Sequence, residues 1–379
     1  MVVNTILSEI ELAGFKSIKR MRKLKLDNLN ILIGANGSGK TNFVSFFKML
    51  QFYLNNRDGL SEFVNKHGGA SGLLHYGSKI TDTISAKLTI TTPSGENNYS
   101  VEFGIAQGDS LYFKDEKVSY TSKDRKAKSD PIHLGSGGKE SRLLQVGEND
   151  EQYDRYSLRT IKTIKSLMQG MSFYQFHDTT PEARIRGASH INDNQYLRSD
   201  AGNLPSFLRM LGEKNPRSYN RILDIARQIA PYIGDITIGS EYDSPYVKLK
   251  WNESVNLDYS FDAGQMSDGS LRAIALVTLL SQPKLPAIIC IDEPELGLHP
   301  EAIAILADLL KCASETSQII ISTQSSALVD FFEPENIIVV DRIQGETQFN
   351  KLEYDKYKPW LEEYSLSQIW NANIFGGRP

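Results

Sequence analysis

The spacing of apolar residues changes from alternating to helical within the first third of the chain. "ILSEIELAGF" (6–15) alternates apolar and polar positions and predicts a strand, and a basic strand follows it over 16–25. "LNILIG" (29–34) is a short apolar strand ending in glycine, and "KTNFVSFFKMLQFYLNN" (40–56) has apolar residues at helical spacing. The predicted order is therefore strand, glycine-rich turn, helix.

The middle of the chain predicts short elements. Residues 82–120 predict an antiparallel meander with turns at "PSGENN" and "AQGDS", and the polar residues 121–141 predict a mobile surface loop. Residues 153–170 and 203–232 predict helices, and prolines break this region into short pieces. No apolar heptad repeat runs between 143 and 262, so a long coiled coil is excluded.

The last third returns to alternating strands and helices. "AIICID", "SQIIIST" and "NIIVVD" predict strands, and "PEAIAILADLLKCAS" predicts the helix between the first two. This order is typical of a parallel sheet with crossover helices. The chain is therefore expected to be an α/β protein, and we find no internal repeat in it.

Composition removes several classes of protein. With 379 residues, 40% of them hydrophobic, the chain can bury a substantial core and form two or three units. No run of eighteen apolar residues and no secretion signal occur, so we expect a cytoplasmic protein without a membrane segment. Two cysteines and six scattered histidines support neither a disulfide framework nor a zinc hydrolase.

The net charge of -4 conceals one local basic strip. Six basic residues lie within ten positions, and they can either contact phosphate or form the solvated face of a strand pair. The strip consists of Lys16, Lys19, Arg20, Arg22, Lys23 and Lys25.

"GANGSGKT" (34–41), here called the phosphate loop, fits the pattern G-x-x-x-x-G-K-[ST] between a predicted strand and a predicted helix. Gly34, Gly37 and Gly39 allow the backbone to wrap around phosphates. Lys40 is expected to reach the β and γ phosphates of ATP, and Thr41 to bind Mg²⁺. The predicted nucleotide-binding residues here are Asn36, Gly37, Ser38, Gly39, Lys40, Thr41 and Asn42.

"AIICIDEPE" (287–295) supplies the acids that a phosphate loop requires. Asp292 ends a buried strand and is expected to bind Mg²⁺ or its water, and Glu293 is expected to polarise the attacking water. The alternative is that both acids merely form a turn at the strand end before Pro294.

"QMSDGSLR" (265–272), here called the signature turn, precedes the apolar helix "AIALVTLLS". Ser, Asp and Gly are all favoured at helix N-caps, but capping explains only one of these three residues. A helix N-terminus is also a good ligand for a γ-phosphate. Within one copy Lys40 and its loop already occupy that position, so we infer that the signature turn serves a second copy.

The order of phosphate loop, signature turn, acid pair and later polar segment resembles the SMC, RecF and OLD branch of the ABC superfamily. "QMSDGSLR" is similar to that branch's signature, with Asp268 where transporters usually carry glycine. The resemblance implies that Ser267 and Gly269 contact the γ-phosphate bound by the opposite subunit. It also makes "EPELGLHP" part of the dimer face and "ISTQSS" (321–326) the switch segment, with Gln324 where many relatives have histidine. "GFKSI" near the start resembles the family's N-terminal strand.

"FYQFHDTTPEAR" and "SLSQIWNANIFGGRP" more closely resemble the prokaryotic OLD-like, AAA-family ATPases of phage-defence operons. This resemblance makes Gln175 the candidate for a metal-linked glutamine. His177 and Asp178 are equally eligible, and a buried polar cluster without a ligand is the alternative. The chain contains no D-x-D pair for the toprim nuclease of OLD proteins, so we expect that it does not cut nucleic acid alone.

The resemblance implies an ABC-type P-loop NTPase with a mixed or parallel core sheet, an antiparallel β subdomain and a short helical insertion. The expected segments are an ATPase lobe at 1–142, a mainly helical insertion with connecting strands at 143–255, and a second ATPase lobe at 256–379.

The preferred function is slow ATP hydrolysis with Mg²⁺ by a homodimer or higher even oligomer. This assembly would control a separately encoded effector, such as a toprim-like nuclease, in antiphage defence. The alternative is a RecF- or SMC-like ATPase of DNA repair or recombination that grips duplex DNA. A third option is a scaffold that binds ATP without hydrolysing it. The DNA-binding alternative would use the basic strip together with Lys123, Arg125, Lys126 and Lys128.

Overall fold

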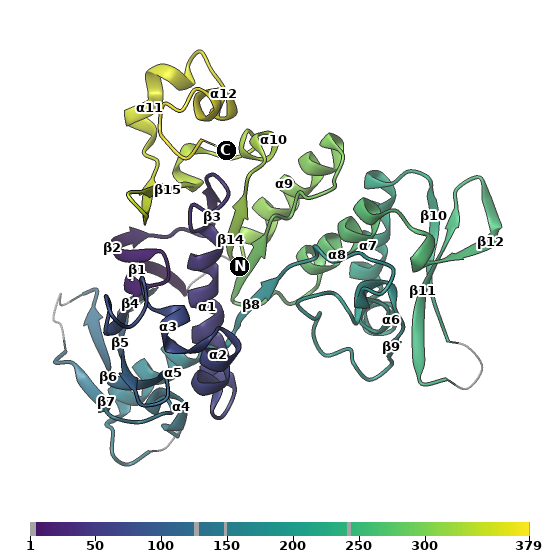
Figure 1. Cartoon of the computed structure of the whole chain (residues 1–379). Coiled ribbons are helices and arrows are strands. Elements are labelled where there is room, and N and C mark those ends of the chain that lie inside the picture. The colour runs from purple at the N-terminus through teal and green to yellow at the C-terminus, as the bar shows by residue number, and fades with distance from the viewer. Residues whose placement is uncertain (1–4, 125–128, 148–149, 241–243, 379) are drawn as a thin grey trace. The chain divides into compact units, whose positions relative to one another are not determined.

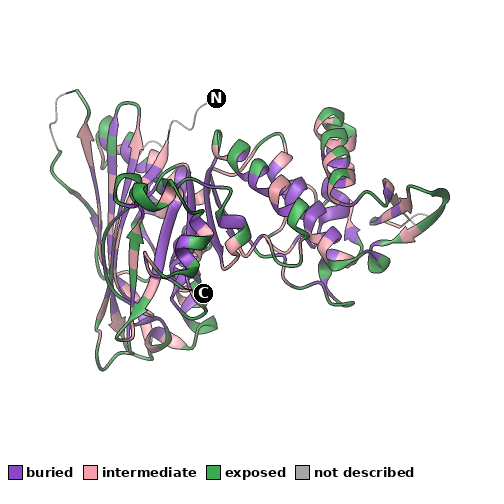
Figure 2. Cartoon of the chain, turned by 90° about the horizontal axis from the view of Figure 1, so that it is seen from above, coloured by how far each residue is buried: buried purple, intermediate pink, exposed green. Residues whose placement is uncertain are grey.

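The chain, seen here as a computed structural model, forms two units (Figure 1). The structure describes residues 5–124, 129–147, 150–240 and 244–378. Unit 1 combines residues 1–171 with 333–379, and unit 2 spans 172–332. In each unit the buried residues gather along the strands and on the helix faces that pack against them (Figure 2). The three segments expected from the sequence divide the chain differently, and their boundaries stay a prediction.

Unit 1 contains a six-stranded antiparallel sheet in the order β2-β1-β4-β5-β6-β7. The predicted N-terminal strand and meander are confirmed, because apolar residues at alternate positions cover one face of each strand. The predicted loop at 121–141 is wrong in part. Ile132 and Leu134 alternate with polar neighbours and form β7, in which Ile132 pairs with Val118 of β6. These strands are β1 Ile6–Phe15, β2 Ile18–Lys25, β4 Thr83–Thr92, β5 Gly95–Ala106, β6 Ser110–Ser122 and β7 Ile132–Gly135.

One buried carboxylate ties this sheet to the helix that follows β7. Glu116 of β6 is fully buried and accepts hydrogen bonds from Tyr99 Oη (2.6 Å), Ser141 Oγ (2.6 Å) and the backbone N–H of Arg142 (2.7 Å). Burial raises the pKa of Glu116, although these hydrogen bonds act in the opposite direction. Glu116 therefore caps the start of α4 Arg142–Gln145 from a neighbouring strand.

The rest of unit 1 carries the phosphate loop. β3 Leu29–Ile33 is buried along its whole length and pairs in parallel with β15 Ile337–Ile343, which pairs with β16 Glu346–Lys351 in antiparallel fashion. α1 Lys40–Asn55 follows the loop and buries three phenylalanines of the apolar face that the sequence predicts. The other helices are α2 Gly59–Lys66, α3 Gly69–Leu73, α4 Arg142–Gln145, α5 Arg155–Gln169, η3 Pro334–Asn336, α11 Tyr354–Leu361 and α12 Leu366–Asn371.

Unit 2 contains the strands that carry the acids and the switch segment. β13 Ile288–Asp292 pairs in parallel with β14 Gln318–Thr323 and neighbours β8 Met171–Tyr174. α8 Asp268–Ser281 is apolar on nearly all sides and is buried accordingly. α9 Pro300–Ser314 connects β13 to β14, and α10 Ser326–Val329 follows β14.

A smaller antiparallel sheet of unit 2 has the order β10-β11-β12, with β9 also pairing with β11. The prolines at 205 and 216 lie in the first turns of α6 and α7, so the predicted helical stretch is split in two. These elements are β9 Ser189–His190, β10 Ile233–Ser240, β11 Tyr246–Glu253, β12 Asn256–Asp262, α6 Leu204–Lys214, α7 Pro216–Ile229, η1 Arg184–Arg186 and η2 Ala263–Gln265.

The predicted α/β fold class is confirmed, with parallel pairs at β3–β15 and β13–β14 beside an antiparallel six-stranded sheet. The longest helix among the described residues has 16 residues, so the absence of a long coiled coil holds there. In the same residues no helix combines the length and the apolar character that crossing a membrane requires.

Candidate nucleotide site and signature turn

The phosphate loop needs glycine at 34 because other backbone lies against it, and at 37 because the backbone there is left-handed. A Cβ on Gly34 would lie 2.2 Å from the carbonyl oxygen of Val340, and Gly37 has φ of 75°. Lys40 is 6% exposed, and its Nζ donates to the carbonyl oxygens of Gly34 (2.5 Å) and Ala35 (3.1 Å). The ammonium group is therefore held against the backbone of the phosphate loop, and its contact with the β and γ phosphates stays a prediction.

A chain of hydrogen bonds supports this loop from the side of β16. Asn42 Nδ2 donates to Ser17 Oγ (2.7 Å), which lies 2.7 Å from Thr347 Oγ1. Thr347 Oγ1 also lies 2.7 Å from the carbonyl oxygen of Ser38. A carbonyl oxygen can only accept, so the Thr347 hydroxyl donates to it and the Ser17 hydroxyl donates to Thr347. Sequence reasoning missed Ser17 and Thr347, because no motif links them to residues 34–41.

The phosphate loop fits the phosphates of a nucleotide. The Ser38 hydroxyl is buried, and among the residues that the structure describes it has no hydrogen-bond partner. A buried hydroxyl without a partner costs free energy, and a phosphate oxygen would satisfy it. Thr41 is exposed in the first turn of α1, where its hydroxyl is accessible to a metal ion.

The acids of "DEPE" (292–295), here called the acid segment, each contact one residue of the switch segment. Ser322 Oγ donates to Asp292, Thr323 Oγ1 donates to Glu295, and Gln324 Nε2 donates to Glu293. The parallel pairing of β13 and β14 brings the two segments together at the carboxyl ends of the strands.

The backbone turns sharply at this edge. Glu293 adopts a left-handed φ of 44°, which is uncommon for a residue with a side chain. Its backbone N–H still donates to the carbonyl oxygen of Ser322 (2.8 Å). Strained backbone of this kind is frequent at functional sites.

Glu295 is a third acid to which the sequence analysis gave no role. Burial raises the pKa of Glu295, and its Oε2 is buried without a partner among the described residues. Among the same residues no group of three or more His, Cys, Asp or Glu side chains can hold a metal by itself. A metal at this edge would therefore need other ligands besides these carboxylates.

The structure orders the three candidates at 175–178 by their contacts. His177 Nε2 donates to the backbone carbonyl oxygen of Asp292 (3.0 Å), and Gln175 Nε2 lies 3.2 Å from His177 Nδ1. Asp178 instead accepts from the hydroxyl of Thr180 (2.8 Å) within its own turn, which lowers the pKa of Asp178. His177 thus contacts Asp292 directly, whereas the metal role of Gln175 stays a prediction.

The signature turn begins α8 with a serine cap. Ser267 is exposed, and its Oγ accepts from the backbone N–H of Ser270 (3.2 Å). Tyr232 Oη donates to Ser270 Oγ (2.8 Å) and lies 3.4 Å from Ser267 Oγ. A Cβ on Gly269 would lie 2.4 Å from the carbonyl oxygen of Gly297, so packing against the residues after the acid segment requires glycine there.

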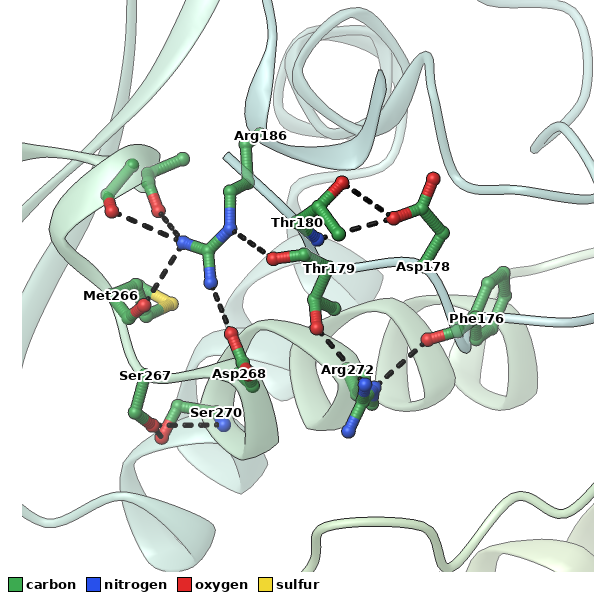
Figure 3. A network of polar contacts seen from close by, with 12 residues as sticks. Phe176, Asp178, Thr179, Thr180, Arg186, Met266, Ser267, Asp268, Ser270 and Arg272 are labelled. Atoms are coloured by element: carbon green, nitrogen blue, oxygen red, sulfur yellow. Dashed lines mark hydrogen bonds and ion pairs between the residues drawn. The ribbon is translucent and has the colours of Figure 1, made fainter. Parts of the chain in front are cut away.

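Arg272 of α8 links the signature turn to residues 176–179 (Figure 3). Its guanidinium group donates to the carbonyl oxygens of Phe176 (3.0 Å) and His177 (2.8 Å) and to Thr179 Oγ1 (2.9 Å). The same stretch therefore contacts α8 through Arg272 and the acid segment through His177.

The basic strip is partly neutralised. Lys19 pairs with Glu346 and Lys23 with Glu9, each at 2.7 Å. Burial lowers the pKa of Lys16, whose Nζ donates to Ser45 Oγ (2.8 Å). Arg20, Arg22 and Lys25 are exposed on β2. The predicted contacts at Arg125, Lys126 and Lys128 lie outside the described residues.

Comparisons with known proteins place these sites in a family. Residues 29–330 match the model of the family described as "AAA domain, putative AbiEii toxin, Type IV TA system". No curated protein matches the chain.

Two solved SMC head structures are similar in fold. The first is an SmcHead bound to the C-winged helix domain of ScpA, with TM-score 0.59 and 16% identity over 93% of this chain and 99% of that one. The second is an Smc head domain with an extended coiled coil bound to the C-terminal domain of ScpA, derived from Pyrococcus furiosus. It has TM-score 0.55 and 15% identity over 95% of this chain and 99% of that one. The family match covers most of the chain, so the protein belongs to this AAA-domain family and has the ABC-type P-loop ATPase fold of SMC heads.

Proposed function

We propose that this protein binds ATP and Mg²⁺ between two copies of itself and hydrolyses the ATP slowly. The observation that carries the proposal is the phosphate loop, in which Lys40 is held against the loop backbone and the buried Ser38 hydroxyl has no partner among the described residues. These are the donors that a triphosphate would satisfy.

In this proposal Thr41 and Asp292 hold Mg²⁺, and the Gln175 side chain is a further ligand of the metal. Bound Mg²⁺ supplies charge neutralisation for the β and γ phosphates. Glu293 takes a proton from a water molecule whose oxygen forms a bond to the γ-phosphorus. The bond from that phosphorus to the β–γ bridging oxygen breaks, giving ADP and phosphate.

Slow turnover is expected because the Glu293 carboxylate already accepts a hydrogen bond. Its Oε1 accepts from Gln324 Nε2, so a water molecule has to share or displace that contact before the carboxylate acts as a base. Gln324 is the proposed switch residue, and an amide, unlike histidine, cannot change its charge when γ-phosphate is released.

The dimer part of the proposal is supported by the exposed cap of α8. Ser267 and the N–H of Gly269 lie at the start of a 14-residue helix, where donors and the helix dipole favour negative charge. If each copy offers this turn to the γ-phosphate on the other copy, two nucleotides stabilise the closed dimer and hydrolysis releases it.

The test is the oligomeric state of Glu293→Gln. Glutamine cannot take the proton, so this variant should retain ATP and elute as a dimer in light scattering with ATP and as a monomer without it. Lys40→Ala is the matched control, which should stay monomeric with ATP. Rapid ATP turnover by monomeric Glu293→Gln protein would overturn the proposal.

We further propose that the dimer acts in the cytoplasm and controls a separately encoded effector, such as a toprim-like nuclease, in antiphage defence. The support is the resemblance of residues 173–184 and 365–379 to OLD-like ATPases, together with the toxin–antitoxin wording of the family description.

A tagged chain should therefore co-purify with the product of a neighbouring gene, in an ATP-dependent manner. Filter binding over a salt series tests the DNA alternative in parallel. Tight, ATP-dependent duplex binding with a steep salt slope, and no protein partner, would replace the effector proposal with a DNA-binding one.

A further inference from the structure

Arg186 gathers the backbone that leads into the signature turn (Figure 3). Its side chain is only 8% exposed, although it lies in the short helix η1, far from α8 along the chain. Nη1 donates to the carbonyl oxygens of Ala263 (2.8 Å), Gly264 (3.2 Å) and Met266 (3.0 Å). Nε donates to the carbonyl oxygen of Thr179 (2.8 Å).

The remaining branch of the guanidinium group contacts a charged residue of the turn itself. Arg186 Nη2 forms an ion pair with Asp268, which lies between Ser267 and Gly269. Asp268 stands where the signature of ABC transporters usually has glycine. Its contact is with Arg186, so Asp268 has a role inside its own chain.

Charge explains why this arrangement depends on arginine. The carbonyl oxygens of Ala263, Gly264 and Met266 converge on one group, and without a cation their dipoles would repel one another and the Asp268 carboxylate. A guanidinium group offers five donors in a fixed plane, whereas a lysine ammonium offers three on a flexible stem. Lysine at 186 would keep the charge and lose most of the geometry.

We propose that Arg186 is a positioning residue that fixes the signature turn, so that Ser267 and the backbone N–H of Gly269 are presented to the nucleotide held by a second copy. This inference rests on the proposed sandwich dimer. It assigns Arg186 to the site completed on the partner copy, and not to the phosphate loop of its own copy.

The assignment has a consequence that a general stabilising role lacks. Arg186→Ala should disturb the signature turn that a protomer offers to its partner. The phosphate loop and the acid segment of the same protomer should stay intact. Monomeric Arg186→Ala protein should bind ATP with wild-type affinity, and its turnover should fall about tenfold or more, the effect of roughly 1.4 kcal/mol of lost transition-state stabilisation.

Mixing variants separates the two roles. Lys40→Ala protein has a defective phosphate loop and an intact signature turn. In a mixed dimer, the loop of the Arg186→Ala protomer meets the turn of the Lys40→Ala protomer, so one nucleotide site is intact. Each mixed dimer has one good site of two, at the phosphate loop of the Arg186→Ala protomer, so a 1:1 mixture should regain turnover that neither variant has alone. Random pairing, in which half of the dimers are mixed, would give about a quarter of wild-type turnover.

Two controls make the outcome decisive. A mixture of Ser267→Glu and Lys40→Ala should regain the same turnover. The new carboxylate repels the phosphate of the partner's nucleotide, so it disables only the signature turn. Arg184→Ala, two residues away and in an exposed ion pair with Asp200, should turn ATP over as wild type does.

If the Ser267→Glu mixture regains turnover and the Arg186→Ala mixture does not, Arg186 acts within its own copy and this inference fails alone. If neither mixture regains turnover, the sandwich dimer itself is wrong. Arg186→Lys should remain close to Arg186→Ala, and wild-type turnover in that variant would contradict the geometric argument.

Discussion

The Thr347 hydroxyl offers a direct test of how the phosphate loop is held. Thr347 is 2% exposed, and its hydroxyl donates to the carbonyl oxygen of Ser38 within the loop. Thr347→Val keeps the branched shape and removes the hydroxyl, so the Ser38 carbonyl oxygen and the Ser17 hydroxyl each lose a partner. The phosphate loop should then leave its phosphate-binding conformation more often.

The expected size follows from the burial of these groups. Leaving a buried polar group without its partner costs about 1–3 kcal/mol. If this free-energy cost applies only to the phosphate-binding conformation of the loop, the apparent Kd for ATP should rise about 5- to 150-fold. Each 1.4 kcal/mol corresponds to about a tenfold change in affinity. Thr347 also limits position 39 to glycine, because an added Cβ there would lie 2.2 Å from Thr347 Oγ1.

Titration with a fluorescent ATP analogue and thermal unfolding should be measured on the same samples. Thr347→Ser is the matched control, because it keeps the hydroxyl and loses a buried methyl group. The serine variant should lose some thermal stability and retain ATP affinity, and the valine variant should lose affinity. Wild-type affinity in Thr347→Val, at a nucleotide concentration near Kd, would refute the supporting role of this hydroxyl.

Three further predictions concern other parts of the chain. Gly269→Ala places a Cβ 2.4 Å from the carbonyl oxygen of Gly297, so steady-state ATP turnover should fall about tenfold or more while the Kd for ATP changes less than about twofold. Thr323→Val removes the donor to Glu295, so turnover should fall with unchanged Kd, and Thr323→Ser should restore it. Burial raises the pKa of Glu116, so the folded chain binds that proton more tightly than the unfolded chain. In urea denaturation, the free energy of unfolding of wild type relative to Glu116→Gln should therefore be largest at acid pH and fall as pH rises through the raised pKa; a difference that grows with pH would contradict this.

The sequence predicts those features that are decided within a few residues. The phosphate loop is recognisable because its glycines, Lys40 and Thr41 have to occupy a fixed spacing before a helix. The cap at Ser267 follows from the polar residues just before an apolar helix, and the structure confirms it. The meander at 82–120 is confirmed for the same reason, since strand alternation and turn residues are both local signals.

Features that depend on distant residues escape the same reasoning. The sequence predicts a loop where β7 forms, because the polar residues around Ile132 and Leu134 dominate the composition and only pairing with β6 makes the strand. The sequence indicates no role for Glu295, because its partner Thr323 lies on the next strand of the sheet. The signal that could have found Glu295 is the third acid beside an acid pair, at the end of a buried strand.

The residues found only in the structure have a common physical role. Thr347 holds the phosphate loop, Arg186 holds the signature turn, and Thr323 holds the acid segment. Each motif residue has to match a ligand, which fixes its type and spacing, whereas a supporting residue has only to deliver a hydrogen bond from any element that reaches the turn. Sequence motifs therefore identify the ligand-facing half of such a site. We expect relatives with the same motifs to support these turns by other donors in other elements, and exchanging a support for a different donor with the same reach should preserve ATP binding.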